Sequence, residues 1–239
     1  MRTVSRHWLF IPSPLLGPAS WSAVADRMEQ RNQRAVVARA PMTTTADNDH
    51  VEPWVGHIAS MPRPDDDRPV VVVGHSAACP RIPLVVDELR RRGWKVENFI
   101  CVDGRFPDGK AFTESASHFG ALLDSIVRPD DYLPPWPRWW GSLVEGLVVD
   151  PSARDQVFSE AAPIPRKFFD QPCPVPELSD HVGAGFLSFG PGYADARDRA
   201  HAAGWMTFSL DGDHLHQVVD PDGVTRTLEA MVACMETGR

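Results

Sequence analysis

The chain has 239 residues, a length that suits one large α/β domain with a sizeable core. Its 24 Lys and Arg residues against 32 Asp and Glu give a formal net charge of −8, and the basic residues are scattered, so we expect neither nucleic acid nor membrane as a partner. The four cysteines lie far apart without a CxxC pair or a histidine cluster. We therefore expect no metal or other cofactor and, since free buried cysteines suit a reducing compartment, a cytoplasmic location. Pro12 and Pro14 interrupt the apolar stretch of residues 8–16, so we also expect no signal peptide.

Short apolar runs alternate along the chain with longer segments of helical periodicity. This pattern is typical of parallel strands joined by crossover helices, and the β-branched and aromatic content of the runs suits a sheet covered on both faces. The sequence thus predicts an α/β fold with a mostly parallel sheet of about six strands and helices on both faces. The predicted strands span residues 8–11, 35–38, 70–73, 96–102, 185–189 and 206–210, and the predicted helices 21–32, 80–92, 114–127, 193–203 and 223–236.

One long segment interrupts this alternation. Between residues 104 and 180 there is no convincing strand, and prolines are frequent. Segments of this length inside a compact domain usually serve function. We interpret 104–180 as a helical cap inserted over the carboxyl edge of the sheet, within a single domain of residues 1–239. Its residues Trp136, Trp139 and Trp140 are candidates for substrate binding, and packing of the cap onto the sheet is the alternative role for them.

A serine stands at the junction of a predicted strand and a predicted helix. Four valines, residues 70–73, run into Gly74-His75-Ser76-Ala77-Ala78, and a helical pattern begins at Pro80. Strand, sharp turn with serine at its apex, then helix is the layout of a nucleophile elbow, whose strained backbone needs small neighbours such as Gly74 and Ala78. Ser76 is therefore the predicted nucleophile, and a structural tight turn is the alternative.

With this elbow the sequence resembles the α/β-hydrolase superfamily. Residues 8–18, Trp-Leu-Phe-Ile-Pro-Ser-Pro-Leu-Leu-Gly-Pro, look like the strand and oxyanion loop of that family. The resemblance implies an oxyanion hole built from the backbone N–H of Ala77 and that of Leu15 or Leu16, because Pro14 has no N–H.

Residues 212–216, Gly-Asp-His-Leu-His, look like the terminal histidine loop of the same family. The catalytic histidine of the family follows the last strand and precedes a helix that starts with proline. The spacing from His214 to Pro221 matches this arrangement better than that from His216, so His214 is the predicted general base.

The acid of the expected triad has no residue in its usual position. Most members of the superfamily place it after the penultimate strand, where this chain has no carboxylate before Asp195. Strand 96–102 ends in Asp103, which follows Ser76 by 27 residues, enough for one helix and one strand. The thioesterase domains of polyketide and peptide synthases are similar here. We predict Asp103 as the acid, with Asp195 or no functional acid as alternatives.

These residues predict a serine hydrolase that cleaves an ester or thioester through an acyl-enzyme. The substrate would be a small acyl compound, free or bound to a carrier protein. Two other hypotheses stay open: a non-hydrolytic enzyme of the same fold that performs cyclisation, transacylation or lyase chemistry, and a catalytically inactive binding protein on this scaffold.

Overall fold

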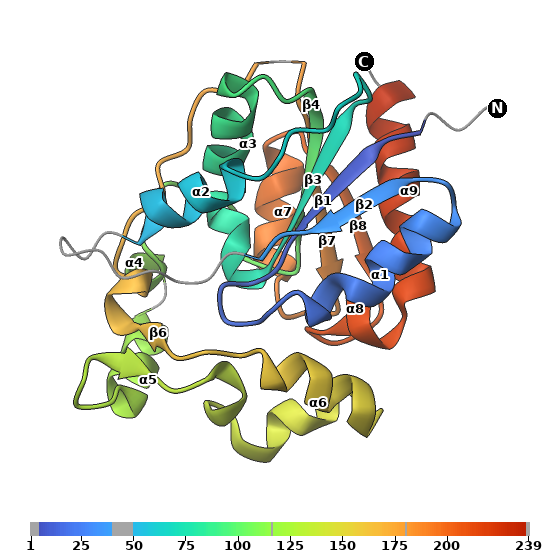
Figure 1. Cartoon of the computed structure of the whole chain (residues 1–239). Helices are drawn as coiled ribbons and strands as arrows, with labels where there is room; N and C mark the ends of the chain where they lie inside the picture. The colour runs from blue at the N-terminus through green and yellow to red at the C-terminus, as the bar shows by residue number, and fades with distance from the viewer. Residues whose placement is uncertain (1–4, 40–49, 116, 180, 238–239) are drawn as a thin grey trace.

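A parallel sheet forms the centre of the protein. The computed structural model describes residues 5–39, 50–115, 117–179 and 181–237. These residues contain a six-stranded sheet of order β2-β1-β3-β4-β7-β8, with parallel pairing throughout (Figure 1). The prediction of a mostly parallel sheet of about six strands is confirmed. Its strands are β1 His7–Ile11, β2 Arg34–Val37, β3 Val70–His75, β4 Val96–Val102, β7 Gly183–Phe189 and β8 Met206–Leu210.

Helices cover both faces of the sheet (Figure 1). The valines of β3 show the reason, because a strand presents alternate side chains to opposite faces. Val70 and Val72 pack in one buried cluster, and Val71 and Val73 pack in another. The first cluster includes residues of α2 (Val51–Ala59), α3 (Ile82–Arg91) and α7 (Ala194–Ala202), and the second includes residues of α1 (Ala19–Gln30) and α9 (Pro221–Thr237).

The segment between β4 and β7 packs onto the rest of the protein through a third buried cluster. Leu15, Ala77 and Leu215 lie in this cluster beside aromatic residues of the inserted segment. Two short strands, Tyr132–Leu133 (β5) and Ile164–Pro165 (β6), pair antiparallel within it, so the expectation of no strand here is wrong. Ala116 and Asp180 of the predicted cap lie outside the described residues. The helices of the segment are α4 Phe112–Ser115, α5 Ser117–Ile126 and α6 Pro151–Ser159, with 3₁₀ helices at Trp136–Arg138, Gly141–Leu147 and Arg166–Phe169.

Two further differences from the predicted elements have local causes. Helix α2 was not predicted, because it has only nine residues and contains Pro53 and Gly56, which weaken the helical signal. The helix expected from Pro80 begins instead as a 3₁₀ helix, Ser76–Arg81, and continues as α3 from Ile82. Proline has no N–H to donate and clashes with the preceding turn, which disfavours regular α-helix across Pro80.

Candidate active site

Ser76 occupies a sharp turn between β3 and the 3₁₀ helix. Its φ is +57°, in the left-handed region that costs a non-glycine residue conformational energy. The neighbouring backbone has no room for larger residues. A Cβ at position 74 would lie 2.3 Å from Cδ1 of Ile82, and one at position 104 would lie 2.3 Å from the carbonyl oxygen of Ser76. Gly74 and Gly104 therefore permit the turn that presents Ser76, which is 8% exposed.

A continuous line of hydrogen bonds leads from Asp103 to Ser76. The distance from His214 Nε2 to Ser76 Oγ is 2.9 Å, and that from His214 Nδ1 to Asp103 Oδ2 is 2.7 Å. The other carboxylate oxygen, Oδ1 of Asp103, accepts the backbone N–H of Phe189 at 2.7 Å. An ionised carboxylate only accepts, so Nδ1 of His214 carries the proton and Nε2 is free to take one from Ser76.

The topology explains how Asp103 reaches His214. Strand β4 lies between β3 and β7, so the residue after β4 stands at the carboxyl edge next to both. The backbone N–H of Asp103 continues the ladder by donating to the carbonyl oxygen of Leu187 at 2.8 Å. Its φ is +43°, and the residue is only 2% exposed. The structure thus brings together Ser76, His214 and Asp103, the three residues that the sequence singled out.

The alternative acid and base lie differently. Asp195 is an exposed residue of α7, and it lines the cavity above Ser76. The ring of His216 packs against Gly212, where a Cβ would come within 2.3 Å of its Nδ1, and against Phe189 at 5.4 Å between ring centroids. The hydrogen bonds to His214 Nδ1 and from His214 to Ser76 are made by Asp103 and His214, and neither alternative residue takes part in them.

His75 is a site residue that the sequence analysis missed. Its Nε2 lies 2.9 Å from the carbonyl oxygen of His214 and donates to it, so His75 holds the backbone of the histidine loop. Burial, and secondarily the neighbouring His214, lowers the pKa of His75 well below its ordinary value, which keeps the ring neutral. The two-residue period of β3 carries the signal, because it places His75 on the same face as Val71 and Val73.

Of the expected oxyanion-hole residues, two line the cavity with Ser76: Leu15 and Ala77. The N–H of Leu15 lies 3.3 Å from the side-chain oxygen of Ser13, a long contact. The N–H of Leu16 instead donates to the carbonyl oxygen of Ser13 at 2.9 Å, within the turn after β1. Both N–H groups are thus engaged with Ser13 within this turn, and of the two residues it is Leu15 that lines the cavity with Ser76. Leu15 is therefore the better placed of the two candidates for the second N–H.

A cavity of about 910 Å³ opens above Ser76. All three tryptophans predicted to bind substrate line it, but they differ in burial. Trp136 and Trp139 are buried and belong to the cluster that packs the inserted segment, whereas Trp140 is 40% exposed. The wall formed by this segment is mainly apolar and aromatic. It includes Phe112, Phe119, Trp136, Trp139, Trp140, Leu143, Val144, Leu147 and Phe169.

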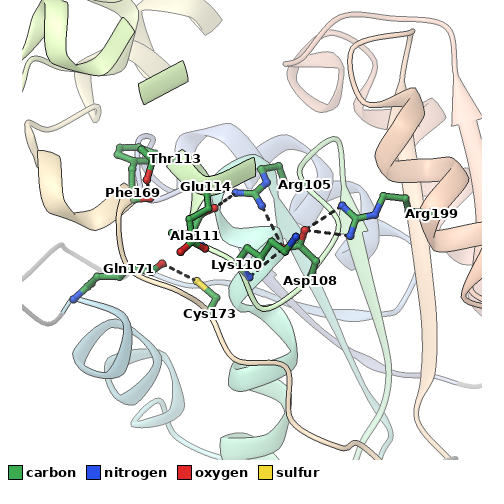
Figure 2. A network of polar contacts seen from close by, with 10 residues as sticks. All are labelled: Arg105, Asp108, Lys110, Ala111, Thr113, Glu114, Phe169, Gln171, Cys173 and Arg199. Carbon is green, nitrogen blue, oxygen red and sulfur yellow. Dashed lines mark hydrogen bonds and ion pairs between the residues drawn. The ribbon is translucent and has the colours of Figure 1, made fainter. Parts of the chain in front are cut away.

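Two arginines that also line the cavity, Arg105 and Arg199, are joined by the carboxylate of Asp108 (Figure 2). Arg105 Nη2 lies 3.3 Å from Oδ1 of Asp108, and both terminal nitrogens of Arg199 lie 3.1 Å from its Oδ2. Arg105 also donates to the carbonyl oxygen of Ala111 at 3.0 Å. Burial lowers the pKa of Arg105. This network connects the start of the inserted segment to α7.

The described residues contain no group of three or more His, Cys, Asp or Glu side chains placed to hold a metal ion. Their four cysteines are free thiols, of which Cys79, Cys101 and Cys173 are buried. Burial raises the pKa of the Cys79 and Cys173 thiols, which disfavours the thiolate that metals and electrophiles require. Within the same residues no helix combines the length and apolar character needed to cross a bilayer.

No protein-family model matches the sequence, and no curated protein matches it either. Solved structures do match. A variant of tomato methylketone synthase I complexed with β-ketoheptanoate has a TM-score of 0.71 at 14% identity, covering 98% of this chain and 100% of that one. A polyneuridine aldehyde esterase variant has a TM-score of 0.69 at 15% identity, covering 94% of this chain and 98% of that one. The pyrethroid hydrolase PytH has a TM-score of 0.67 at 13% identity, covering 96% of this chain and 98% of that one.

The chain therefore has the α/β-hydrolase fold, as these similarities show together with the parallel sheet. Identities of 13–16% define a fold and leave the reaction to be argued from the site. The likeness to synthase thioesterases stays a prediction.

Proposed function

We propose that this protein is a serine hydrolase that cleaves an ester or thioester through an acyl-enzyme on Ser76. The observation that carries the proposal is the line of contacts at 2.7 and 2.9 Å from Asp103 through His214 to Ser76. His214 takes the serine proton as Oγ attacks the carbonyl carbon, and Asp103 holds the imidazole tautomer and stabilises the imidazolium. The backbone N–H groups of Ala77 and Leu15 receive the oxyanion, and water then releases the acid.

The substrate class follows from the cavity. Its volume of about 910 Å³ lies in the range of sites for small organic ligands, and its inserted wall is apolar. We propose that a bulky apolar acyl group occupies this wall, with Trp136, Trp139 and Trp140 as contacts. The leaving group, a free alcohol or thiol or one carried by a protein, would lie toward the open side.

Labelling with a fluorophosphonate tests the proposal, because this reagent reacts with an activated serine. The wild-type protein should acquire one label on Ser76 and hydrolyse a p-nitrophenyl ester, with one equivalent of acid for each phenolate released. Ser76→Ala should lose the label and reduce kcat by about 10⁴-fold or more. Ser125→Ala, an exposed serine on α5, is the matched control and should behave as wild type.

Two outcomes would overturn the proposal: a folded wild-type protein that takes no label, or a Ser76→Ala variant that retains its turnover. Consumption of ester without release of free acid would indicate the non-hydrolytic alternative at the same serine.

A further inference from the structure

Arg81 places a buried cation next to the turn that presents Ser76. Its side chain is fully buried, and the residue ends the 3₁₀ helix that begins with Ser76. The guanidinium donates from Nη1 to the carbonyl oxygen of Ala77 at 2.9 Å and from Nη2 to that of Phe168 at 3.1 Å. The hydrogen bonds among Ser76, His214 and Asp103 do not use this charge.

The sequence explains why the guanidinium lies at Ala77. In a 3₁₀ helix the carbonyl oxygen of a residue accepts from the N–H three residues later, and for Ala77 that residue is Pro80, which has no N–H. A buried carbonyl oxygen without a donor is costly. The side chain of Arg81 supplies a donor in its place, so its charge is held against the residue that follows Ser76.

No carboxylate offsets the charge of Arg81, which takes part in none of the ion pairs formed by the described residues. The titratable groups that act on it are the Cys173 thiol and a second cation, Arg105. Burial raises the pKa of the Cys173 thiol, which is therefore neutral. Burial also lowers the pKa of Arg81 to about 10, and the group stays charged at neutral pH. A cation buried with only carbonyl dipoles and a ring around it is costly, so a negative charge that develops nearby is stabilised.

We propose that Arg81 is a positioning residue of the oxyanion hole, whose charge, held on the carbonyl oxygen of Ala77, stabilises the oxyanion that forms at the Ala77 N–H. The inference rests on the serine hydrolase function proposed above. As Ser76 attacks, a bond forms between Oγ and the carbonyl carbon of the substrate, and the π electron pair of that carbonyl moves to its oxygen. The serine proton passes to Nε2 of His214. One negative charge thus appears at the residue whose carbonyl oxygen binds Arg81.

The effect of Arg81 is confined to the charged state. The oxygen of the bound ester carries no full charge, whereas the oxygen of the tetrahedral intermediate carries one, so the guanidinium favours the intermediate over the bound substrate. Backbone and hydrogen-bond dimensions put the guanidinium roughly 6–9 Å from the oxyanion. At an effective dielectric constant of about 20, the attraction at this distance corresponds to about 10- to 100-fold in rate. Loss of the charge should therefore lower kcat and leave KM nearly unchanged.

A pair of inhibitors separates this role from packing. A trifluoromethyl alkyl ketone accepts Ser76 Oγ and becomes a tetrahedral adduct with an oxyanion, whereas the alcohol of the same carbon skeleton binds without reacting. Arg81→Gln keeps an amide donor and removes the charge. We expect this variant to bind the ketone about 10- to 100-fold more weakly than wild type and the alcohol equally well. Its kcat for a p-nitrophenyl ester should fall by the same factor.

Arg6→Gln is the matched control, because Arg6 is also a buried arginine and precedes β1, at the edge of the sheet opposite to Ser76. It should lower stability in urea and leave kcat and both affinities at their wild-type values. Arg81→Met is a second variant, since an apolar side chain can often replace a buried ion without loss of the fold. It should show the same selective loss of affinity for the ketone.

Two outcomes would overturn the role of Arg81: a folded Arg81→Gln or Arg81→Met protein that prefers the ketone over the alcohol as strongly as wild type does, or an equal loss of affinity for both ligands. The second outcome would mark Arg81 as a structural residue. Failure of the proposed function gives a different result, a wild-type protein that takes no fluorophosphonate label and binds the ketone no better than the alcohol.

Discussion

Asp103 makes two hydrogen bonds with its two carboxylate oxygens, and each has a separate consequence. Oδ2 receives the Nδ1 proton of His214, and Oδ1 receives the backbone N–H of Phe189. The second bond fixes the rotamer that the first requires. Its donor lies on β7, so the carboxylate is oriented by the neighbouring strand of the sheet. The residue is 2% exposed, and water therefore competes little for either bond.

Asp103→Asn should reduce kcat by about 10⁴-fold, as the same change does in the Ser-His-Asp triad of a serine protease. The amide oxygen of asparagine can still accept from Phe189, which leaves an NH₂ group facing His214 and forces the wrong tautomer. The fold should be preserved, as measured by circular dichroism. Asp195→Asn should lose less than about tenfold, because Asp195 is the exposed alternative. If Asp195→Asn lost more activity than Asp103→Asn, Asp195 would be the acid.

His75 should make the stability of the protein depend on pH. Its pKa is lowered in the folded state, chiefly by burial, and returns to about 6.5 on unfolding. Below pH 6.5 the unfolded chain binds a proton that the folded one excludes, so the free energy of unfolding should fall as pH decreases, by up to about 1.4 kcal/mol per pH unit. Above pH 6.5 His75 is neutral in both the folded and the unfolded state, so its protonation no longer lowers the free energy of unfolding.

His75→Gln tests this assignment, since its amide can still donate to the carbonyl oxygen of His214 but does not titrate. Urea unfolding of both proteins between about pH 5 and 7.5 should show a smaller decrease for the variant below pH 6.5. Parallel curves would mean that other groups cause the acid sensitivity.

At the scale of the secondary-structure elements, the turn between β3 and α3 depends on the absence of a side chain at Gly104. Gly104 approaches from the end of β4, where a Cβ would lie 2.3 Å from the carbonyl oxygen of Ser76 and 2.5 Å from Sγ of Cys79. A methyl group can be accommodated there only if the turn or β4 moves. Both movements displace the serine relative to His214.

Gly104→Ala should therefore destabilise the protein by about 1–3 kcal/mol, as overpacking does, and reduce kcat by about 10²-fold if the serine shifts by about 1 Å. Gly56→Ala is the control, because position 56 is helical and, beyond its chain neighbours and the backbone of its own helix, no atom of the described residues lies within 4 Å of the added Cβ. That variant should be more stable by about 0.5–1 kcal/mol. Urea unfolding and ester turnover measure both effects; a Gly104→Ala protein with wild-type values would refute the contact.

At the scale of the whole molecule, a buried cation, Arg81, joins the turn at Ser76 to the inserted segment. The guanidinium of Arg81 donates to the carbonyl oxygens of Ala77 at 2.9 Å and Phe168 at 3.1 Å. It also lies 3.7 Å from the centroid of the Phe168 ring. Burial lowers the pKa of Arg81 to about 10, and the group remains charged at neutral pH. The segment that forms the apolar wall of the cavity is thus bound to Ala77, the residue that follows Ser76.

The two neighbouring tryptophans of this wall should respond differently to substitution. Trp139 is 7% exposed and donates from Nε1 to the carbonyl oxygen of Pro134 at 2.7 Å, so Trp139→Ala should cost about 3–5 kcal/mol of stability. Trp140 is 40% exposed, and Trp140→Ala should cost less than about 1 kcal/mol. It should instead change the ratio of kcat/KM between long and short acyl esters. Equal effects on all chain lengths would mark Trp140 as a packing residue.

The sequence by itself determined the elements whose signal is local. The valine run, the small residues around Ser76 and the alternation of apolar runs with helical segments predict the sheet and its elbow, because strand and helix periods are properties of neighbouring residues. The spacing from Ser76 to Asp103 and the position of His214 after the last strand were also readable. Each of these residues follows a predicted strand, and parallel strands end at the same edge.

Only the tertiary structure decided which of the candidate groups meet. That Leu16 uses its N–H within its own turn depends on turn geometry, and that His75 supports the histidine loop depends on a contact between segments 139 residues apart. The paired strands Tyr132–Leu133 and Ile164–Pro165 are two residues long, too short to show a period. Their structure comes from burial against the cluster around Phe169, which no local pattern encodes.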